Sequence, residues 1–184
     1  MSLTETPVCN FGEKIKDFKL ISTEDTFVSL KDIKGQNGTL IMFICNHCPY
    51  VKAVIKELVD ITNKLSKIGV NSVAIMSNDV NNYPEDSFEN MKKFSKINDF
   101  KFPYLYDETQ SIAQNFGAVC TPDFFGYNKN NELQYRGRFT EMKNLKPVLD
   151  EKNDLLNAME LIAETSNGPK QQFPSMGCNI KWKR

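Results

Sequence analysis

The apolar run from Leu40 to Ile44 is the strongest strand signal in the chain. It has the length and β-branched content of a buried strand, and it leads directly into Cys45-Asn-His-Cys48. After Cys48, apolar residues recur every three or four positions, which predicts an amphipathic helix of about five turns with one stripe facing the core. Gly69 follows, where a glycine commonly ends a helix. The stripe consists of Val51, Val54, Ile55, Leu58, Ile61, Leu65 and Ile68.

A second apolar run, Val70 to Ser77, also has strand length. Strand, helix and strand at this spacing form a βαβ unit with parallel pairing, which excludes an all-β fold. The polar loop of residues 78–85 follows the second strand. Open α/β sheets place functional loops at this end of their strands.

Shorter patterns predict the remaining elements of one α/β domain over residues 1–184. Residues 1–16 and the tail 166–184 show no periodicity, so we expect both to be irregular. The other elements are a β-hairpin over 18–30, a turn or one helical turn over 31–38, a helix over 86–98, a short strand over 102–106, a short helix with Asp107 as N-cap ending at Phe116, an antiparallel hairpin over 119–139, and a closing helix of about 14 residues containing Leu155 to Ile162.

The charge balance excludes some classes of partner. Lys and Arg together number 23, as do Asp and Glu, so no net field attracts nucleic acid or an anionic membrane surface. No apolar run approaches the length needed to span a bilayer, and the N-terminus has no basic region followed by an apolar segment. We therefore expect a cytoplasmic protein that binds neither nucleic acid nor membrane, with its oligomeric state left open.

The chain contains five cysteines, an odd number spread over its whole length. Because thiols persist in a reducing cytosol, a structural disulfide framework is not expected. Redox, catalytic or metal-binding use remains for the paired cysteines.

Cys45 and Cys48 are spaced to lie on one turn at the start of the predicted helix, close enough to form a disulfide. Cys45 would meet unpaired backbone N–H groups and the positive end of the helix dipole. We therefore expect the pKa of Cys45 to lie below the ordinary thiol value of about 8.5. Cys48 is then the expected resolving thiol, which attacks a mixed disulfide formed at Cys45.

His47 is the only histidine, and it stands inside the motif. As a cation it would favour the Cys45 thiolate and make the pair more oxidising, although a lone histidine is often only a surface residue. A Cys-x-x-Cys can also be half of a zinc site. Zinc takes four ligands and the chain has no second Cys/His pair, so we expect no metal and no cofactor.

The order of strand, Cys-x-x-Cys, long helix, strand and helix, followed by Thr121-Pro122, a hairpin and a final helix, resembles the thioredoxin-like superfamily. Residues 17–35 are similar to the N-terminal hairpin of its redoxin branch, which includes AhpC/TSA relatives and TlpA-type thiol-disulfide oxidoreductases. The Cys-Asn-His-Cys motif and residues 177–182 resemble a group of bacterial redoxin-domain proteins. The match covers roughly residues 17–162. It implies a thioredoxin-like three-layer α/β/α sandwich with a central mixed β-sheet and an N-terminal β-hairpin.

The resemblance also implies roles for single residues. Cys45 and Cys48 match the two redox cysteines, and Pro122 matches the cis-proline, with a trans turn proline as the alternative. The cis form would place the Thr121 backbone beside Cys45, ready to pair with an extended substrate strand. Ile44 replaces the thioredoxin Trp, and Thr39 replaces the buried acid. Both departures, with Asn-His in place of Gly-Pro, argue against a general thioredoxin.

The other cysteines have open roles. Cys120 is either an accessory resolving thiol near the pair or a buried apolar residue, and Cys178 has the same two interpretations. Cys9 is expected to be incidental. Arg136 and Arg138 lie on one predicted strand, and we expect both to face solvent.

These observations leave three classes of function. The first is a thiol-disulfide oxidoreductase that exchanges a Cys45/Cys48 dithiol with protein or low-molecular-weight disulfides. The second is a peroxiredoxin-like thiol peroxidase that uses Cys45, but Ile41 and Met42 stand where such enzymes carry a hydroxyl residue. The third is a metal-binding carrier or redox sensor.

Overall fold

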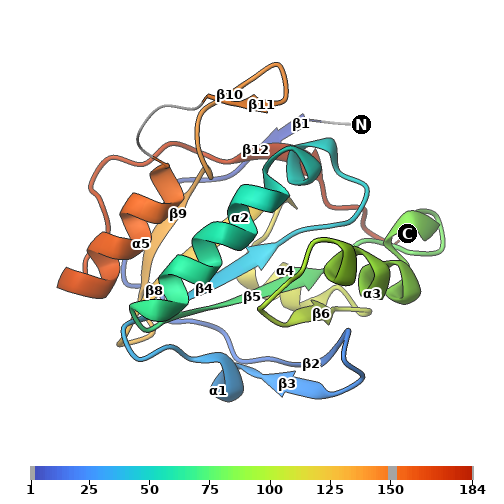
Figure 1. The fold of residues 1–184 in the computed structure, drawn as a ribbon, viewed down its shortest axis with the longest axis horizontal. Coiled ribbons are helices and arrows are strands. Elements are labelled where there is room, and N and C mark those ends of the chain that lie inside the picture. The colour runs from blue at the N-terminus through green and yellow to red at the C-terminus, as the bar shows by residue number, and fades with distance from the viewer. Residues whose placement is uncertain (1–2, 149–152, 184) are drawn as a thin grey trace.

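The computed structural model describes residues 3–148 and 153–183, and its centre is a seven-stranded sheet with helices on both faces (Figure 1). The strands of all the sheets in the described residues are β1 (Leu3–Glu5), β2 (Lys19–Ser22), β3 (Phe27–Ser29), β4 (Gly38–Phe43), β5 (Val70–Met76), β6 (Tyr104–Tyr106), β7 (Cys120–Thr121), β8 (Asp123–Asn128), β9 (Leu133–Gly137), β10 (Met142–Lys143), β11 (Lys146–Pro147) and β12 (Met176–Asn179). Its helices are α1 (Leu30–Ile33), α2 (Pro49–Lys67), the 3₁₀ turn η1 (Pro84–Asp86), α3 (Phe88–Ile97), α4 (Ser111–Phe116) and α5 (Asp154–Thr165).

The sheet is mixed, with the strand order β3-β2-β6-β5-β4-β8-β9. β4 runs parallel to β5, and β5 runs parallel to β6, while the remaining neighbours are antiparallel. The βαβ unit and both hairpins predicted from the sequence are confirmed. β4 is an interior strand that pairs with β5 on one side and β8 on the other, and all of its residues are buried, so the motif follows a fully buried strand.

The two faces of the sheet carry separate apolar clusters, because alternate residues of a strand point to opposite sides. Leu40 and Met42 of β4 pack with residues of α2 and α5, which lie in front of the sheet in Figure 1. Ile41 and Phe43 pack in the opposite cluster, which contains residues of α1 and α4. The expected three-layer arrangement is confirmed.

Helix α2 begins at Pro49, with Cys48 as its N-cap. Proline is favoured at the first helical position because its missing N–H has no helical partner there. The predicted apolar stripe is buried as far as Leu65, and the chain leaves the helix through Gly69 at φ +78°. The helix therefore starts after the Cys-x-x-Cys motif, whereas the sequence predicts both cysteines on its first turn.

Both ends of the chain contribute to a second sheet, in the order β1-β12-β7. The expectation that residues 1–16 and 166–184 are irregular is therefore wrong for Leu3–Glu5 and Met176–Asn179. These strands are three and four residues long and are held by main-chain pairing, so they leave almost no periodicity in the sequence. Their pairing brings the C-terminal strand onto Thr121.

Two local predictions need correction. The N-cap of α4 is Gln110 rather than Asp107, although the Asp107 carboxylate accepts hydrogen bonds from the N–H groups of Ile112 and Ala113 at 3.3 and 2.9 Å. The spacing of apolar residues along 86–98 predicts Ile97 on or near the apolar face of α3, but Ile97 is exposed.

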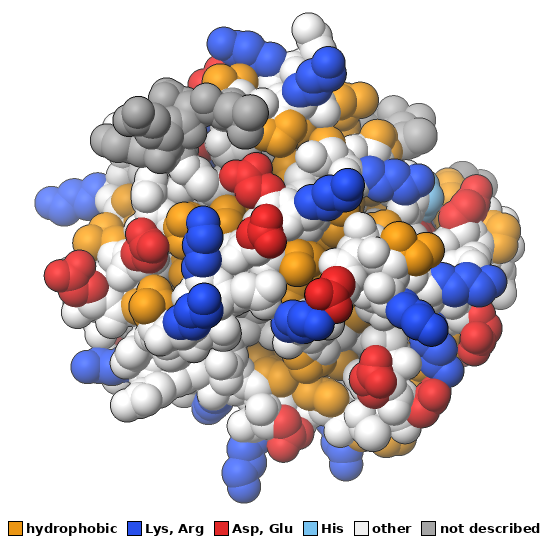
Figure 2. Space-filling view, in the orientation of Figure 1, with side chains coloured by type: hydrophobic (Ala, Val, Ile, Leu, Met, Phe, Trp, Pro, Cys, Tyr) orange, Lys and Arg blue, Asp and Glu red, His pale blue; other side chains and the backbone are white. Residues whose placement is uncertain are grey.

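Basic and acidic side chains are interspersed over the face shown in Figure 2, in agreement with the balanced composition. Among residues 3–148 and 153–183, no helix is both long enough and apolar enough to cross a membrane.

Candidate redox site

The Cys-x-x-Cys motif occupies the connection from β4 to α2, and the side chains of Cys45 and Cys48 are both buried. Asn46, between them, is also buried. Its Nδ2 donates to the Glu85 carbonyl at 3.0 Å, and its Oδ1 accepts from the Tyr104 hydroxyl at 3.0 Å. The motif is thus anchored to the loop after β5 and to β6.

The Thr121–Pro122 peptide bond is cis, as the resemblance implies. It places Thr121 against both cysteines. The Thr121 hydroxyl lies 3.4 Å from Cys45 Sγ, and the Thr121 carbonyl accepts from Cys48 Sγ at 3.1 Å. The structure thus brings four of the expected site residues together.

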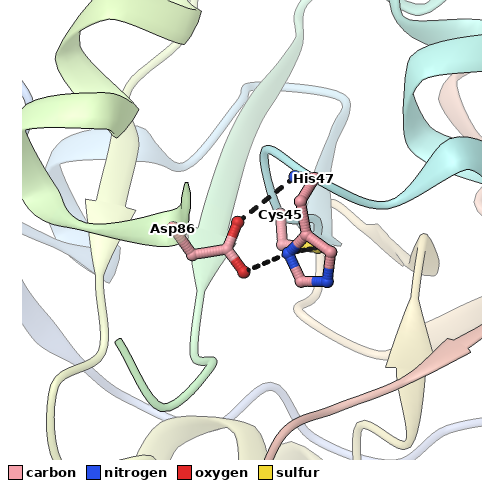
Figure 3. A group of neighbouring side chains, drawn as sticks. All are labelled: Cys45, His47 and Asp86. Atoms are coloured by element: carbon pink, nitrogen blue, oxygen red, sulfur yellow. Dashed lines mark hydrogen bonds and ion pairs between the residues drawn. The ribbon is translucent and has the colours of Figure 1, made fainter. Parts of the chain in front are cut away.

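The fifth, His47, is held by a residue that the sequence does not single out. His47 Nδ1 lies 2.7 Å from Asp86 Oδ2, and Figure 3 shows the carboxylate directed at both the ring and the backbone N–H of His47. The same ring nitrogen lies 3.8 Å from Cys45 Sγ. Asp86 also accepts from Asn46 N and Asn78 Nδ2, both at 2.8 Å. The sequence signal for Asp86 is its position next to the polar loop after β5, at the same edge of the sheet as the motif.

This ion pair shifts the titration of both partners. The hydrogen bond to Asp86 raises the pKa of His47, and this effect outweighs the desolvation of the ring. Burial would raise the pKa of Asp86, but hydrogen bonds from His47 and Asn78 hold the pKa of that carboxyl below its usual range. The two shifts agree, since each favours the charged form of its group.

The acidity of the two cysteines is opposite to that expected from the sequence. The pKa of Cys45 is raised well above its ordinary value, because its thiol donates to Cys48, because it is buried, and because the Asp86 carboxylate lies near. The pKa of Cys48 is lowered to about 5, first by the hydrogen bond from Cys45 and then, against the effect of burial, by the Val51 N–H. The pKa of Cys45 is not lowered as predicted, because the hydrogen bond to Cys48 and burial raise it, and because α2 begins at Pro49, so that its first N–H groups lie nearer to Cys48.

The edge of Thr121 that was expected to receive a substrate strand is already paired. β12 runs antiparallel to β7, with Cys178 opposite Thr121 and Asn179 opposite Cys120. A substrate strand can pair with Thr121 only where β12 gives way. Cys178 is buried, and its sulfur lies 3.3 Å from Cys48 Sγ.

The two remaining cysteines lie in different surroundings. Cys120 is buried, with its sulfur 3.5 Å from the Pro122 carbonyl oxygen, and burial raises the pKa of its thiol. Burial also raises the pKa of the half-buried Cys9 to about 11. Cys178, rather than Cys120, is the additional cysteine whose sulfur has a hydrogen-bond contact with Cys48.

Arg136 does not face solvent. Its side chain is buried, donates to Asp123 Oδ2 at 3.0 Å and to the Gly117 carbonyl at 2.8 Å, and lies over the Phe125 ring. Arg138 is half-buried and forms an ion pair with Asp154 at 2.6 Å. The predicted exposure is wrong because the C-terminal segment covers this strand, where Gln172 Oε1 accepts from the Arg136 backbone N–H.

Cys45, His47 and Asp86 each place one ligand-type atom within 4.8 Å of the others. A zinc site needs about four such ligands. The hydrogen bonds at Asp86 already engage both of its oxygens and His47 Nδ1. The geometry is accounted for by the ion pair, and binding a metal here would require its disruption.

A cavity of about 410 Å³ opens beside the cis-proline. Its lining includes Tyr50 from the first turn of α2, Pro122, and Met176 from β12. The cavity reaches the cis-proline, but its lining includes neither Cys45 nor Cys48.

The AhpC/TSA family model matches residues 11–140. A conserved protein from Geobacillus kaustophilus has 42% identity and a TM-score of 0.93, with 100% of this chain and 97% of that chain covered. The thioredoxin domain of a thiol-disulfide oxidoreductase from Bacteroides vulgatus has 16% identity and a TM-score of 0.58, with 68% and 86% covered. A peroxidoxin from Mycobacterium tuberculosis has 15% identity and a TM-score of 0.58, with 83% and 92% covered. No curated protein matches. The last two similarities establish the fold alone.

Proposed function

Because the chain belongs to the AhpC/TSA family, we propose that it is a thiol-disulfide oxidoreductase, in which Cys45 and Cys48 exchange a dithiol with protein or small-molecule disulfides. The observation that carries the proposal is that both buried cysteines contact Thr121 of the cis Thr121–Pro122 peptide, with Cys45 Sγ 3.4 Å from its hydroxyl and Cys48 Sγ 3.1 Å from its carbonyl oxygen. Two thiols that share one proton are suited to form a disulfide with each other, since one of them is already a thiolate.

In the reduced pair, the two sulfurs hold one proton between them, and a proton on Cys48 is accepted by the Thr121 carbonyl oxygen. As a substrate disulfide approaches, the proton passes to Cys48, and the Cys45 thiolate attacks one substrate sulfur. The substrate S–S bond breaks, and its other half leaves as a thiolate. Cys48 then gives up its proton and attacks the Cys45 sulfur, so that a Cys45–Cys48 bond forms and the second substrate thiolate leaves. The dithiol is oxidised, and the substrate is reduced to two thiols, with one proton from the pair and one from water.

His47 supports this chemistry without forming a bond. As a cation held by Asp86, it lies 3.8 Å from Cys45 Sγ and stabilises the thiolate that forms there during exchange. Stabilising the reduced pair makes the disulfide more oxidising.

The test is the reduction of oxidised glutathione by the reduced protein, with Cys45→Ser, Cys48→Ser and the matched control Cys120→Ser. Cys120 is also a buried thiol, but its sulfur has a hydrogen-bond contact with the Pro122 carbonyl oxygen. We expect Cys45→Ser to react with oxidised glutathione far more slowly than wild type, Cys48→Ser to stop after releasing one glutathione, and the control to retain the wild-type rate. A Cys45→Ser protein that reduces the disulfide at the wild-type rate would contradict the proposal.

Cys48→Ser provides a second measurement. Without the resolving thiol, the mixed disulfide at Cys45 should persist, and mass spectrometry should find glutathione on that residue. The same variant should retain substrate proteins from a cell extract as reducible conjugates.

The second candidate is a thiol peroxidase, which the Thr121 hydroxyl 3.4 Å from Cys45 Sγ favours. The Cys45 thiolate would attack a hydroperoxide, releasing an alcohol or water, and Cys48 would condense with the resulting sulfenic acid to give the disulfide and water. Peroxide consumption with a thiol reductant tests this candidate. Consumption that depends on Cys45 and greatly exceeds the rate of disulfide exchange would favour the peroxidase.

A further inference from the structure

Cys178 lies at the far side of the redox pair, on the strand that covers it. Its sulfur is 3.3 Å from Cys48 Sγ, and Cys48 in turn is hydrogen-bonded to Cys45. The Cys48 sulfur therefore has a thiol on each side. A disulfide requires about 2.0 Å between sulfurs, so a side-chain adjustment of little more than 1 Å would join Cys48 to Cys178.

The position of Cys178 is set by the backbone of β12. Cys178 is paired with Thr121, and the Ile180 N–H donates to the Val119 carbonyl at 3.1 Å. Gly177 lies so close to Thr121 that a Cβ at this position would overlap the Thr121 carbonyl oxygen. Only glycine permits this approach, so the strand holds Cys178 at the pair.

Contacts on both sides of Cys178 anchor the strand. Before it, the Ser175 hydroxyl donates to the Pro122 carbonyl at 2.8 Å. After it, the Lys181 N–H donates to Asn78 Oδ1 at 2.9 Å, and the Lys181 carbonyl accepts from Gln110 Nε2 at 2.8 Å. Asn78 also donates to Asp86, so the same loop residue connects the C-terminal strand to the His47 side of the site.

We propose that Cys178 is a third redox thiol, which accepts the disulfide from the Cys45–Cys48 pair. The inference rests on the proposed function, since that reaction supplies the Cys45–Cys48 disulfide. The Cys178 thiol loses its proton and attacks Cys48 Sγ, the Cys48–Cys178 bond forms, and the Cys45–Cys48 bond breaks. Cys45 leaves as a thiolate and takes up a proton. One disulfide replaces another, so no further oxidant or reductant is needed.

Cys45 is the leaving group of this exchange because Cys48 is the sulfur that Cys178 contacts. The His47 cation beside Cys45 Sγ stabilises the departing thiolate, whereas Cys48 stays covalently bound at every stage. The exchange regenerates Cys45 as a thiol and leaves the disulfide between Cys48 and Cys178 of β12. The oxidised protein therefore exists in two forms that differ in the position of one disulfide.

The test is disulfide mapping after treatment with oxidised glutathione, acid quenching, alkylation and digestion. Wild type should give both Cys45–Cys48 and Cys48–Cys178 peptides. Cys45→Ser should give the Cys48–Cys178 peptide as its intramolecular disulfide. Cys178→Ala should lose that peptide completely and keep Cys45–Cys48, while the control Cys120→Ser should match wild type.

The outcomes separate this inference from the proposed function. If wild type forms only Cys45–Cys48, and Cys45→Ser carries only glutathione on Cys48, the relay is wrong and the oxidoreductase stands. If wild type forms no Cys45–Cys48 disulfide, the proposed function fails. Because Cys178 is buried, circular dichroism of Cys178→Ala provides the check on folding, and the Cys45→Ser result tests the relay with Cys178 intact.

Discussion

Two buried carboxylates, Asp86 and Asp123, are each paired with a base, yet only one pair belongs to the redox site. The Asp86 side chain is 0% exposed, and its partner His47 is 16% exposed at 2.7 Å. The Asp123 side chain is also 0% exposed, and its partner Arg136 is 9% exposed at 3.0 Å. The two pairs have similar exposure, but the pKa is lowered for Asp86 and raised for Asp123.

The hydrogen bonds around each carboxylate explain this difference. Asp86 accepts from two backbone N–H groups and from Asn78 as well as from His47, so its pKa is lowered. Burial raises the pKa of Asp123 to about 6, against the opposing effect of Arg136. At Asp123 desolvation therefore outweighs the hydrogen bonds and the Arg136 charge, whereas at Asp86 the hydrogen bonds outweigh desolvation. Contact with Cys45 then makes His47–Asp86 chemically relevant, while Arg136–Asp123 ties β8 to β9.

The largest effect on stability is expected for Arg136→Ala. Removing the guanidinium leaves a buried carboxylate without its partner, so the free energy of unfolding should fall by about 3–5 kcal/mol in chemical denaturation. The half-buried Arg138 provides the control, and Arg138→Ala should cost about 1 kcal/mol or less. Equal losses in the two variants would contradict the assigned role of the Arg136–Asp123 pair. The fraction of Arg136→Ala that remains folded should exchange disulfides at the wild-type rate.

Asp86→Asn should lower the free energy of unfolding by about 2 kcal/mol, because the charge that strengthens several hydrogen bonds is lost. It should also lower the pKa of Cys45, since the carboxylate raises it. Thiol alkylation as a function of pH measures the second effect. Asp123→Asn is the control, and it should leave the alkylation of Cys45 unchanged. If both variants shift Cys45 alike, the distinction between the two pairs fails.

Cys45→Ala should raise the pKa of Cys48 from about 5, because the hydrogen bond from Cys45 is the largest cause of its lowering. Each unit by which the pKa of Cys48 rises corresponds to about 1.4 kcal/mol and to tenfold less Cys48 thiolate at a pH below the new pKa. Ultraviolet thiolate absorbance during a pH titration measures this change. Cys178→Ala should raise the pKa by less, because Cys178 contributes less to the lowering. An unchanged titration in Cys45→Ala would show that the two thiols do not share a proton.

His47→Gln should have the smallest effect, because Asp86 keeps the hydrogen bonds from two backbone N–H groups and from Asn78, and that effect should depend on pH. The folded-state pKa of His47 is raised, so its contribution is present below the unfolded pKa of about 6.5 and is lost as the pH rises through the raised value. The pKa of Asp86 is lowered, so its contribution is present above about pH 3.8 and is lost as the pH falls through the lowered value. Denaturation of both proteins across this range should show the largest difference between those limits. A difference independent of pH would contradict an ionic His47–Asp86 pair.

The fold was largely predictable because its central elements carry their own pattern. The continuous apolar residues of β4 and β5 and the stripe of α2 reflect burial, which selects residue type at every position. β1 and β12 were not predictable, since backbone pairing holds them and backbone groups are the same in every residue. The burial of Arg136 was missed because its covering segment is more than 30 residues distant in sequence, as the hydrogen bond to Gln172 shows.

By itself, the sequence determined which residues can perform the chemistry. The spacing of Cys45 and Cys48 after a buried strand and the Thr-Pro before a hairpin are local features, and local features can be read from one chain segment. The tertiary structure alone decided their acidity and their neighbours. Asp86, Thr121 and Cys178 come from three distant segments, and their electrostatic and hydrogen-bond effects depend on distance in space, which separation along the chain does not give.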